Sequence, residues 1–127
     1  MNKRELGAAG ETAALKYYIA KGYALVSKNW RYRRFGEIDF ILSGCGAKCE
    51  NKHDLLVFCE VKLRNKKSFL TPAEAVNITK QNRIRKLAEI FISINPQFEN
   101  YIVRFDIAEL YYDESLNYRV RILEEAF

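Results

Sequence analysis

Two short acidic motifs hold the residue types in this chain that could do chemistry. The first is GEID at residues 36–39 and the second is EVK at residues 60–62, each within an apolar run. Twenty residues separate Asp39 from Glu60, and Lys62 follows Glu60 by two positions. Two carboxylates and a lysine at the ends of adjacent buried strands would make a poor core. They suit a site that holds a divalent metal and activates water against a phosphodiester.

Strand geometry decides whether these three side chains can meet. Alternation along a strand places Glu60 and Lys62 on one face. If the two acidic strands are adjacent and antiparallel, Asp39 lies beside Glu60, and the paired charges repel unless a cation lies between them. Oxygen ligands suit Mg²⁺ or Mn²⁺, and Lys62 would orient or deprotonate water or stabilise charge on the phosphate. The alternative is structural: Glu60 and Lys62 form an ion pair, and Asp39 is a solvated strand end.

The elements around these motifs alternate in the manner of an α/β domain. Periodicity and chain breakers predict helices at residues 4–21 and 71–94 and strands at residues 23–30, 37–42, 54–63, 101–111 and 116–123. The second helix is expected to begin with Thr71 as its N-cap, and Asn77 is a candidate break. A long helix between the third and fourth strands is what a parallel right-handed crossover requires. We therefore expect one domain over residues 1–127, with a mixed central sheet flanked by helices and the last strand at an edge.

Composition favours an anionic partner. Lysine and arginine total 21 against 16 acidic residues, for a formal charge of +5, and nucleic acid is the leading candidate. The N-terminus has no uninterrupted apolar region typical of a signal peptide, and no run of about 18 apolar residues predicts a membrane span. Three cysteines without an export signal favour reduced thiols in the cytoplasm.

Basic residues flank both acidic motifs in the sequence. Those expected to contact nucleic acid are Arg31, Arg33, Arg34, Arg64, Lys66 and Lys67. Trp30, Tyr32 and Phe35 interleave with the first three, which is typical of a surface that follows a phosphate backbone. A further basic group at residues 80–86 is interpreted as a solvated helix face.

Two further acids are interpreted as structural. Glu37 is expected to support the site through an ion pair with Arg33 or Arg34, although it could also be a ligand. Asp106 follows Arg104 by two positions in a predicted strand, and we interpret the two as a structural ion pair.

The chain resembles the PD-(D/E)xK, or restriction-endonuclease-like, superfamily, and within it the small bacterial YraN family. The motifs that carry the resemblance are GE at 10–11, GY at 22–23, NWR at 29–31, GEID at 36–39, FCEVKLR at 58–64, TPAEAV at 71–76, Lys80 and RFD at 104–106. The resemblance implies an αβββαβ core and a site of Asp39, Glu60 and Lys62. Similarity to Holliday-junction resolvases adds Glu11 on the first helix. Cys59 departs from the branched apolar residue that the family often has there.

Together these observations predict a metal-dependent endonuclease-like protein acting on structured or duplex nucleic acid, with DNA ahead of RNA. Glu11, Asp39, Glu60 and Lys62 are the expected catalytic residues, and the three carboxylates are the expected ligands of Mg²⁺ or Mn²⁺. One alternative is a non-catalytic nucleic-acid-binding module on the same fold, and another is an interaction protein without nucleic acid. Resolvase-like enzymes work as dimers, so a homodimer also stays open.

Overall fold

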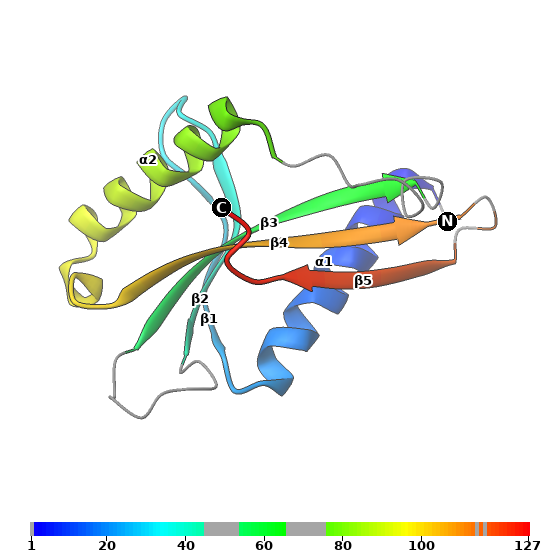
Figure 1. Ribbon diagram of the computed structural model, residues 1–127, viewed down its shortest axis with the longest axis horizontal. Helices are drawn as coiled ribbons and strands as arrows, with labels where there is room; N and C mark the ends of the chain where they lie inside the picture. The colour runs from blue at the N-terminus through cyan, green and yellow to red at the C-terminus, as the bar shows by residue number, and fades with distance from the viewer. Residues whose placement is uncertain (1, 45–53, 66–75, 114, 116) are drawn as a thin grey trace.

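A five-stranded sheet with two long helices forms the body of the molecule (Figure 1). The computed structural model describes residues 2–44, 54–65, 76–113, 115 and 117–127. In chain order the elements are α1 (Lys3–Ala20), β1 (Ala24–Arg31), β2 (Glu37–Gly44), β3 (Leu55–Asn65), α2 (Ile78–Ile94), the short 3-10 helix η3 (Pro96–Phe98), β4 (Ile102–Tyr112) and β5 (Tyr118–Leu123). The predicted α/β class and order of elements are confirmed.

The sheet is mixed, and its strands lie in chain order from β1 to β5. β1, β2 and β3 pair antiparallel, β3 and β4 pair parallel, and β5 returns antiparallel to β4. α2 supplies the connection that the parallel pair requires. β5 lies at an edge, as predicted, and the arrangement is consistent with a restriction-endonuclease-like core.

The two helices cover opposite faces of the sheet. Val57 and Cys59 of β3 pack in one apolar cluster with Tyr18 of α1. Phe58, which alternates with them, packs in a second cluster with Phe91 of α2. β3 is thus covered twice, which explains its continuous apolar run.

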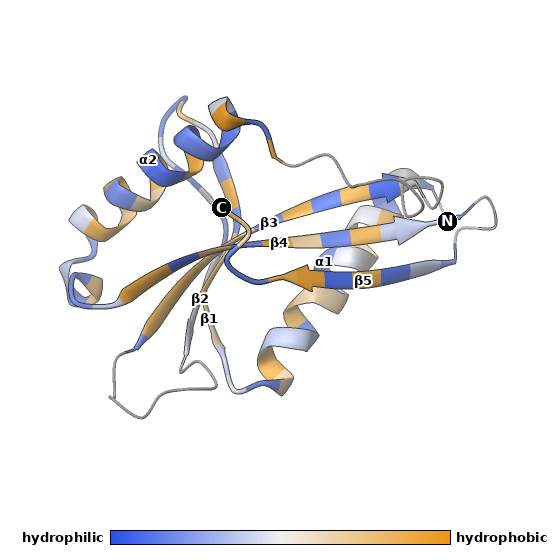
Figure 2. Cartoon of the chain, viewed as in Figure 1, coloured by the Kyte–Doolittle hydropathy of each residue, from blue (hydrophilic) through white to orange (hydrophobic). Residues whose placement is uncertain are grey.

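Hydropathy along the strands changes where the sheet leaves its core. Figure 2 shows apolar colouring over the first half of β3 and alternating apolar and hydrophilic bands over its second half, whereas β4 has hydrophilic bands along most of its length. The hydrophilic residues in the second half of β3 include Glu60, Lys62 and Arg64. In the described part of the chain, no helix has both the length and the apolar character that crossing a bilayer requires.

Side-chain caps set where both helices begin. Asn2 and Glu5 form a reciprocal capping box at the start of α1. At α2, Asn77 has an extended backbone and its side chain accepts a hydrogen bond from the Lys80 N–H at 2.9 Å. The helix that reaches Ile94 therefore begins at Ile78, so the helix predicted over residues 71–94 does not run continuously through Asn77. Its predicted first part, residues 71–75, lies outside the described residues. The predicted N-cap Thr71 lies outside the described residues.

A buried polar network ties α1 to β4 and the C-terminal segment. Asp106 is fully buried and accepts hydrogen bonds from the Tyr18 hydroxyl at 2.7 Å and from two Arg104 nitrogens at 2.9 Å. It also accepts one from the Glu125 N–H at 3.1 Å. The predicted structural ion pair of Arg104 and Asp106 is confirmed, and its buried carboxylate has donors on every side.

Candidate active site

The two acidic motifs meet where the β2–β3 ladder ends. The strands pair antiparallel from Gly44 opposite Leu55 to Phe40 opposite Cys59. Continuing this register by one residue sets Asp39 opposite Glu60. The Asp39 Oδ2 atom accepts a hydrogen bond of 2.8 Å from the backbone N–H of the next residue, Val61. The adjacency expected from the sequence is therefore present, and a backbone donor fixes the Asp39 carboxylate in place.

Negative charge accumulates around Asp39. Burial, together with the neighbouring charges of Glu60, Glu11 and Glu37, raises the pKa of its carboxyl to about 7, against the opposing effect of the hydrogen bond from Val61. The structure thus brings Glu11, on α1, into the electrostatic surroundings of Asp39. A hard cation would relieve this repulsion, and carboxylate oxygens are the ligands it prefers. The oxygen donors are of the type that Mg²⁺ or Mn²⁺ prefers, and a metal at this position stays a prediction.

Gly10 lies at a close contact between α1, which carries Glu11, and the sheet. It is buried, and a Cβ built on it would lie 2.5 Å from the Leu110 Cδ2 atom of β4. A side chain at this point would force the Leu110 side chain to shift, so glycine suits the close approach of the helix to the sheet. Glu11 itself is half-buried, and its Oε2 atom lies 3.8 Å from the Lys28 ammonium of β1.

Glu60 already has a cationic partner. The Lys80 ammonium of α2 lies 2.6 Å from the Glu60 Oε1 atom, and the Glu60 side chain is only 10% exposed. Among the residues that the structure describes, no three Asp, Glu, His or Cys side chains are gathered into a ready metal-binding group. A cation at Glu60 would therefore have to replace the lysine.

Lys62 shares its strand face with Glu60. It lies two residues further along β3, opposite Glu109 of β4, and its side chain is partly exposed. Its position suits the predicted role near the acids, and that role stays a prediction.

Glu37 supports the hairpin in front of the site. Its Oε2 atom lies 2.8 Å from an Arg31 guanidinium nitrogen and 2.9 Å from another. The two residues are cross-strand partners in the β1–β2 register. The supporting role expected for Glu37 is present, but its partner is Arg31, whereas Arg33 or Arg34 was expected.

The basic residues predicted to contact nucleic acid occupy different surroundings. Arg33 and Arg34 are exposed at the turn between β1 and β2. Arg64 is only 14% exposed, and its Nε atom lies 3.2 Å from buried Glu109, so it has a structural role. Arg31 is exposed although it pairs with Glu37. Lys66 and Lys67 lie outside the described residues.

Aromatic rings line the same hairpin. The Trp30 and Tyr32 rings stack with centroids 6.2 Å apart, and those of Tyr32 and Phe35 lie 6.1 Å apart. Trp30 also packs edge-on against Phe91 of α2, whereas Phe35 is half exposed. The exposed end of this row is Phe35, which directly follows the exposed Arg33 and Arg34 in the turn.

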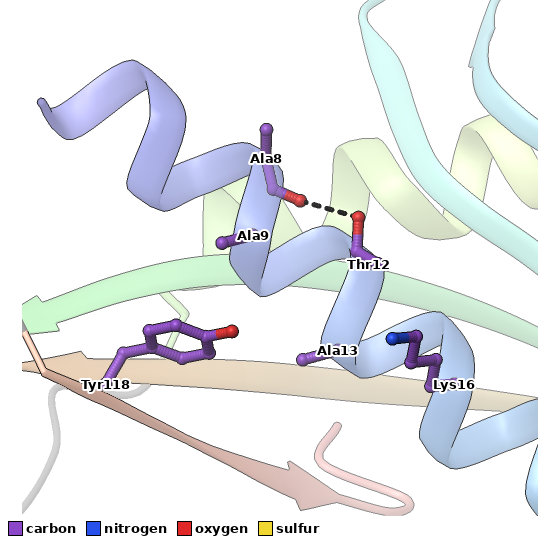
Figure 3. A pocket seen from close by; sticks show the side chains of 6 residues that line it. All are labelled: Ala8, Ala9, Thr12, Ala13, Lys16 and Tyr118. Atoms are coloured by element: carbon purple, nitrogen blue, oxygen red, sulfur yellow. Dashed lines mark hydrogen bonds between the residues drawn. The ribbon is translucent and has the colours of Figure 1, made fainter. Parts of the chain in front are cut away.

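An open pocket of about 450 Å³ lies elsewhere, between α1 and β5. Figure 3 shows Ala9 and Ala13 of α1 directed toward Tyr118, with the Thr12 hydroxyl donating to the Ala8 carbonyl at 3.0 Å. Its lining residues are Ala8, Ala9, Thr12, Ala13, Lys16 and Tyr118. It contains none of the four predicted catalytic residues, so the proposed chemistry does not use it.

Comparison with known proteins gives the family. A family model described as "Uncharacterised protein family UPF0102" matches residues 10–110. The chain belongs to this family. A UPF0102 protein of Acetivibrio thermocellus is 40% identical over 113 residues, which cover 89% of this chain and 80% of the relative. A UPF0102 protein of Caldicellulosiruptor bescii is 37% identical over 128 residues, which cover 100% of both chains. The resemblance to the YraN family is confirmed, since UPF0102 is that family.

Sequence reasoning missed the lysine at the centre of the site. Lys80 was grouped with a solvated helix face, yet it is the partner of Glu60. One signal could have found it: Lys80 lies in the first turn of the crossover helix, three residues after Asn77, which can act as a cap. A crossover helix packs back onto the sheet it follows, so the first turn of α2 can come close to the acids of β2 and β3.

Asp39→Asn is expected to stabilise the protein in the presence of chelator. The Asp39 pKa is about 7 in the folded protein against an ordinary value of 3.8, so the folded state binds the proton more tightly. The free energy of unfolding therefore falls as the pH rises from about 4 to about 7, and the variant lacks this fall. Allowing for solvent screening, we expect a gain of roughly 1–2 kcal/mol at about pH 8, or roughly 3–10 °C in Tm.

Thermal melts across this pH range with excess chelator measure the effect. Asp54→Asn, at an exposed carboxylate beside the start of β3, is the control and should follow the parent. Parallel curves for the parent and Asp39→Asn would contradict the acidic cluster.

Proposed function

We propose that this protein is a metal-dependent endonuclease-like enzyme that hydrolyses phosphodiester bonds in structured or duplex nucleic acid. The observation that carries the proposal is the juxtaposition of Asp39 and Glu60 at the end of the β2–β3 ladder, with Glu11 in their electrostatic surroundings. Such crowding of acids is costly to a fold. It is useful where a cation and a phosphate are to be held.

Each residue of the site has a role in this proposal. Asp39 and Glu60 would hold Mg²⁺ or Mn²⁺, with Glu11 as a further ligand. When bound, the ion would supply Lewis-acid activation of the phosphodiester and of water. Lys62 orients or deprotonates the attacking water, or stabilises charge that develops on the phosphate. The Val61 N–H holds the Asp39 carboxylate against β3, next to Glu60 in the sequence of that strand.

The hairpin between β1 and β2 is the proposed nucleic-acid surface. Arg33 and Arg34 are exposed there beside Phe35, and the formal charge of the chain is +5. Arginines next to exposed rings suit a phosphate backbone and its bases. DNA is proposed ahead of RNA and a homodimer is compatible with the proposal. The buried free thiol of Cys59 suits a reducing cytoplasm.

One observation favours a second candidate, a nucleic-acid-binding module without catalysis. Lys80 already neutralises Glu60, and the described residues contain no ready metal-binding group. A scaffold that had lost catalysis could keep this ion pair for stability. The same hairpin would then bind nucleic acid without cleaving it.

The deciding experiment is incubation of the pure protein with branched, duplex and single-stranded DNA and RNA. Each substrate is tested with Mg²⁺, with Mn²⁺ and with chelator, beside Asp39→Asn. Cleavage that needs the metal and is lost in the variant supports the enzyme. Binding without cleavage under every condition, equal in both proteins, supports the binding module.

Binding to nucleic acid is expected to weaken steeply with salt. Three phosphate contacts would lower the affinity of duplex DNA about 40-fold between about 50 mM and about 200 mM salt. Replacing Arg33 and Arg34 by alanine should reduce the slope of log affinity against log salt by about two. Fluorescence anisotropy in chelator measures both slopes. Lys86→Ala, on the exposed side of α2, is the control. An unchanged salt slope in the double variant would show that the β1–β2 hairpin does not contact nucleic acid.

A further inference from the structure

We propose that Lys80 is a displaceable counter-ion of the acidic site. Without a bound metal ion, the Lys80 ammonium pairs with the Glu60 carboxylate. When a metal ion binds Glu60, the Lys80 ammonium leaves that carboxylate and contacts a phosphate of the nucleic acid. This inference rests on the proposed function, because it concerns how the same site changes from a metal-free to a loaded state.

The position of Lys80 in its helix is the first observation. Lys80 is the third residue of α2, and its N–H is held by the Asn77 cap at 2.9 Å. The N-terminus of a helix carries partial positive charge, so a lysine in the first turn is unfavourable there. The first turn of α2 contains no acidic residue to offset it. Glu60, at 2.6 Å, is the group that compensates this charge.

The second observation is how this ion pair differs from the others around the site. Lys28 lies 3.8 Å from Glu11, a looser contact. Glu37 pairs with Arg31, whose side chain is 75% exposed. Glu60 is nearly buried and is in close contact with a lysine. Glu60, an expected metal ligand, is therefore also the carboxylate whose oxygen is in close contact with a lysine ammonium.

Competition follows from chemistry at a single atom. The Lys80 ammonium contacts the Glu60 Oε1 atom, and a divalent cation would need carboxylate oxygens of the same group. Both cations cannot occupy that oxygen at the same distance, because like charges repel strongly in a partly buried site.

The displaced lysine remains at the mouth of the site. The Lys80 side chain is 38% exposed, so water reaches it already, and its four-carbon stem is flexible. An ammonium has three donors and no acceptor. A phosphate of bound nucleic acid is the anion that the proposed function brings there. Metal and nucleic acid should therefore strengthen each other's binding in the parent, as linkage requires.

Lys80→Met tests the inference through metal affinity, measured by calorimetric titration of Mn²⁺ and Mg²⁺ without nucleic acid. We expect Lys80→Met to bind either metal about three- to tenfold more tightly, because Glu60 no longer has a competing partner. Lys80→Arg should bind metal more weakly than Lys80→Met, because a guanidinium still occupies Glu60 and can hold a carboxylate through two donors. Lys86→Met, on the exposed side of the same helix, is the matched control and should equal the parent.

Nucleic-acid binding gives a second readout. In the presence of Mn²⁺, Lys80→Met should lose affinity for duplex DNA, and the salt slope should fall by about one. In chelator, where Lys80 is held by Glu60, its loss should change DNA affinity little. A lysine with a purely structural role would lower the Tm and leave metal affinity and the metal-dependent part of DNA binding unchanged.

The outcomes separate this inference from the proposed function. If Lys80→Met binds metal no more tightly than the parent while Asp39→Asn loses metal, the counter-ion role is wrong and the site stands. If Asp39→Asn binds metal like the parent, the site itself is wrong. Tighter metal binding by Lys80→Met together with weaker binding by Asp39→Asn supports both.

Discussion

Glu60→Gln and Asp39→Asn are each expected to lose about a thousandfold or more in cleavage rate, because each removes a charge that holds the metal at the reacting phosphate. Both should also bind Mg²⁺ and Mn²⁺ more weakly than the parent. Both should fold, since the amides keep the shape of the acids and the apolar strands around them are unchanged. Calorimetric metal titration, circular dichroism and cleavage of any substrate found measure the three effects.

Lys62→Ala should fail in a different way. It keeps the carboxylates, so metal and nucleic acid should bind as in the parent while turnover falls about 100- to 10,000-fold, as expected for a group that acts in the transition state. Lys86→Ala is the control for loss of a lysine far from the acids. If the two carboxylate variants bind metal and cleave like the parent, the two-carboxylate hypothesis is wrong and the binding module replaces it.

The fold could be predicted because its signals are local and repeated. The apolar run of β3, the long helix that follows it and the alternation in β4 each indicate one element, and together they require a parallel crossover. The closeness of Asp39 and Glu60 followed from the same logic, because two adjacent antiparallel strands bring their opposite ends together. The sequence could thus predict the framework of the site.

The partners of the acids could not be predicted in the same way. Glu60 of β3 and Lys80 of α2 are separated by the connection between the strand and the helix. No local spacing in the sequence determines which turn of the helix lies against Glu60. Placing the helix start at Thr71, and not after Asn77, also obscured that Lys80 lies in a first turn. The pairing of Arg31 with Glu37 could have been predicted, because the two residues are opposite each other in the register of the β1–β2 hairpin. A symmetric turn between these strands indicates that register.

The largest loss of stability is expected from Asp106→Ala. Asp106 is fully buried and accepts hydrogen bonds from Tyr18, Arg104 and the Glu125 N–H. Its removal leaves the buried Arg104 guanidinium with only a loose contact to Glu124 at 3.8 Å, and the buried Tyr18 hydroxyl with only the Cys59 sulfur, a weak acceptor, at 3.6 Å. Breaking such a pair costs about 3–5 kcal/mol, which is a large part of the roughly 5–15 kcal/mol that stabilises a domain. Denaturant unfolding measures the change, and we expect the midpoint to fall with an unchanged slope.

A double variant separates the cost of a broken pair from the value of the intact one. Arg104→Met with Asp106→Leu removes both charges and should recover part of the loss, because no buried charge is left alone. Glu89→Gln, at an exposed carboxylate of α2, should change stability by less than about 0.5 kcal/mol. A double variant as unstable as Asp106→Ala would show that the network contributes packing and not charge compensation.

The same variant also tests how the acids of this chain divide between stability and chemistry. Asp106 lies on the face of the sheet that α1 covers, where Tyr18 reaches it, whereas Glu60 lies on the face of α2, where Lys80 reaches it. The loss in Asp106→Ala should therefore be equal in chelator and in Mg²⁺. Asp39→Asn should differ between the two, because it gains stability in chelator and loses the stabilisation that bound metal gives the parent. A metal-dependent loss in Asp106→Ala would place Asp106 within the site, and the division of roles proposed for these carboxylates would be wrong.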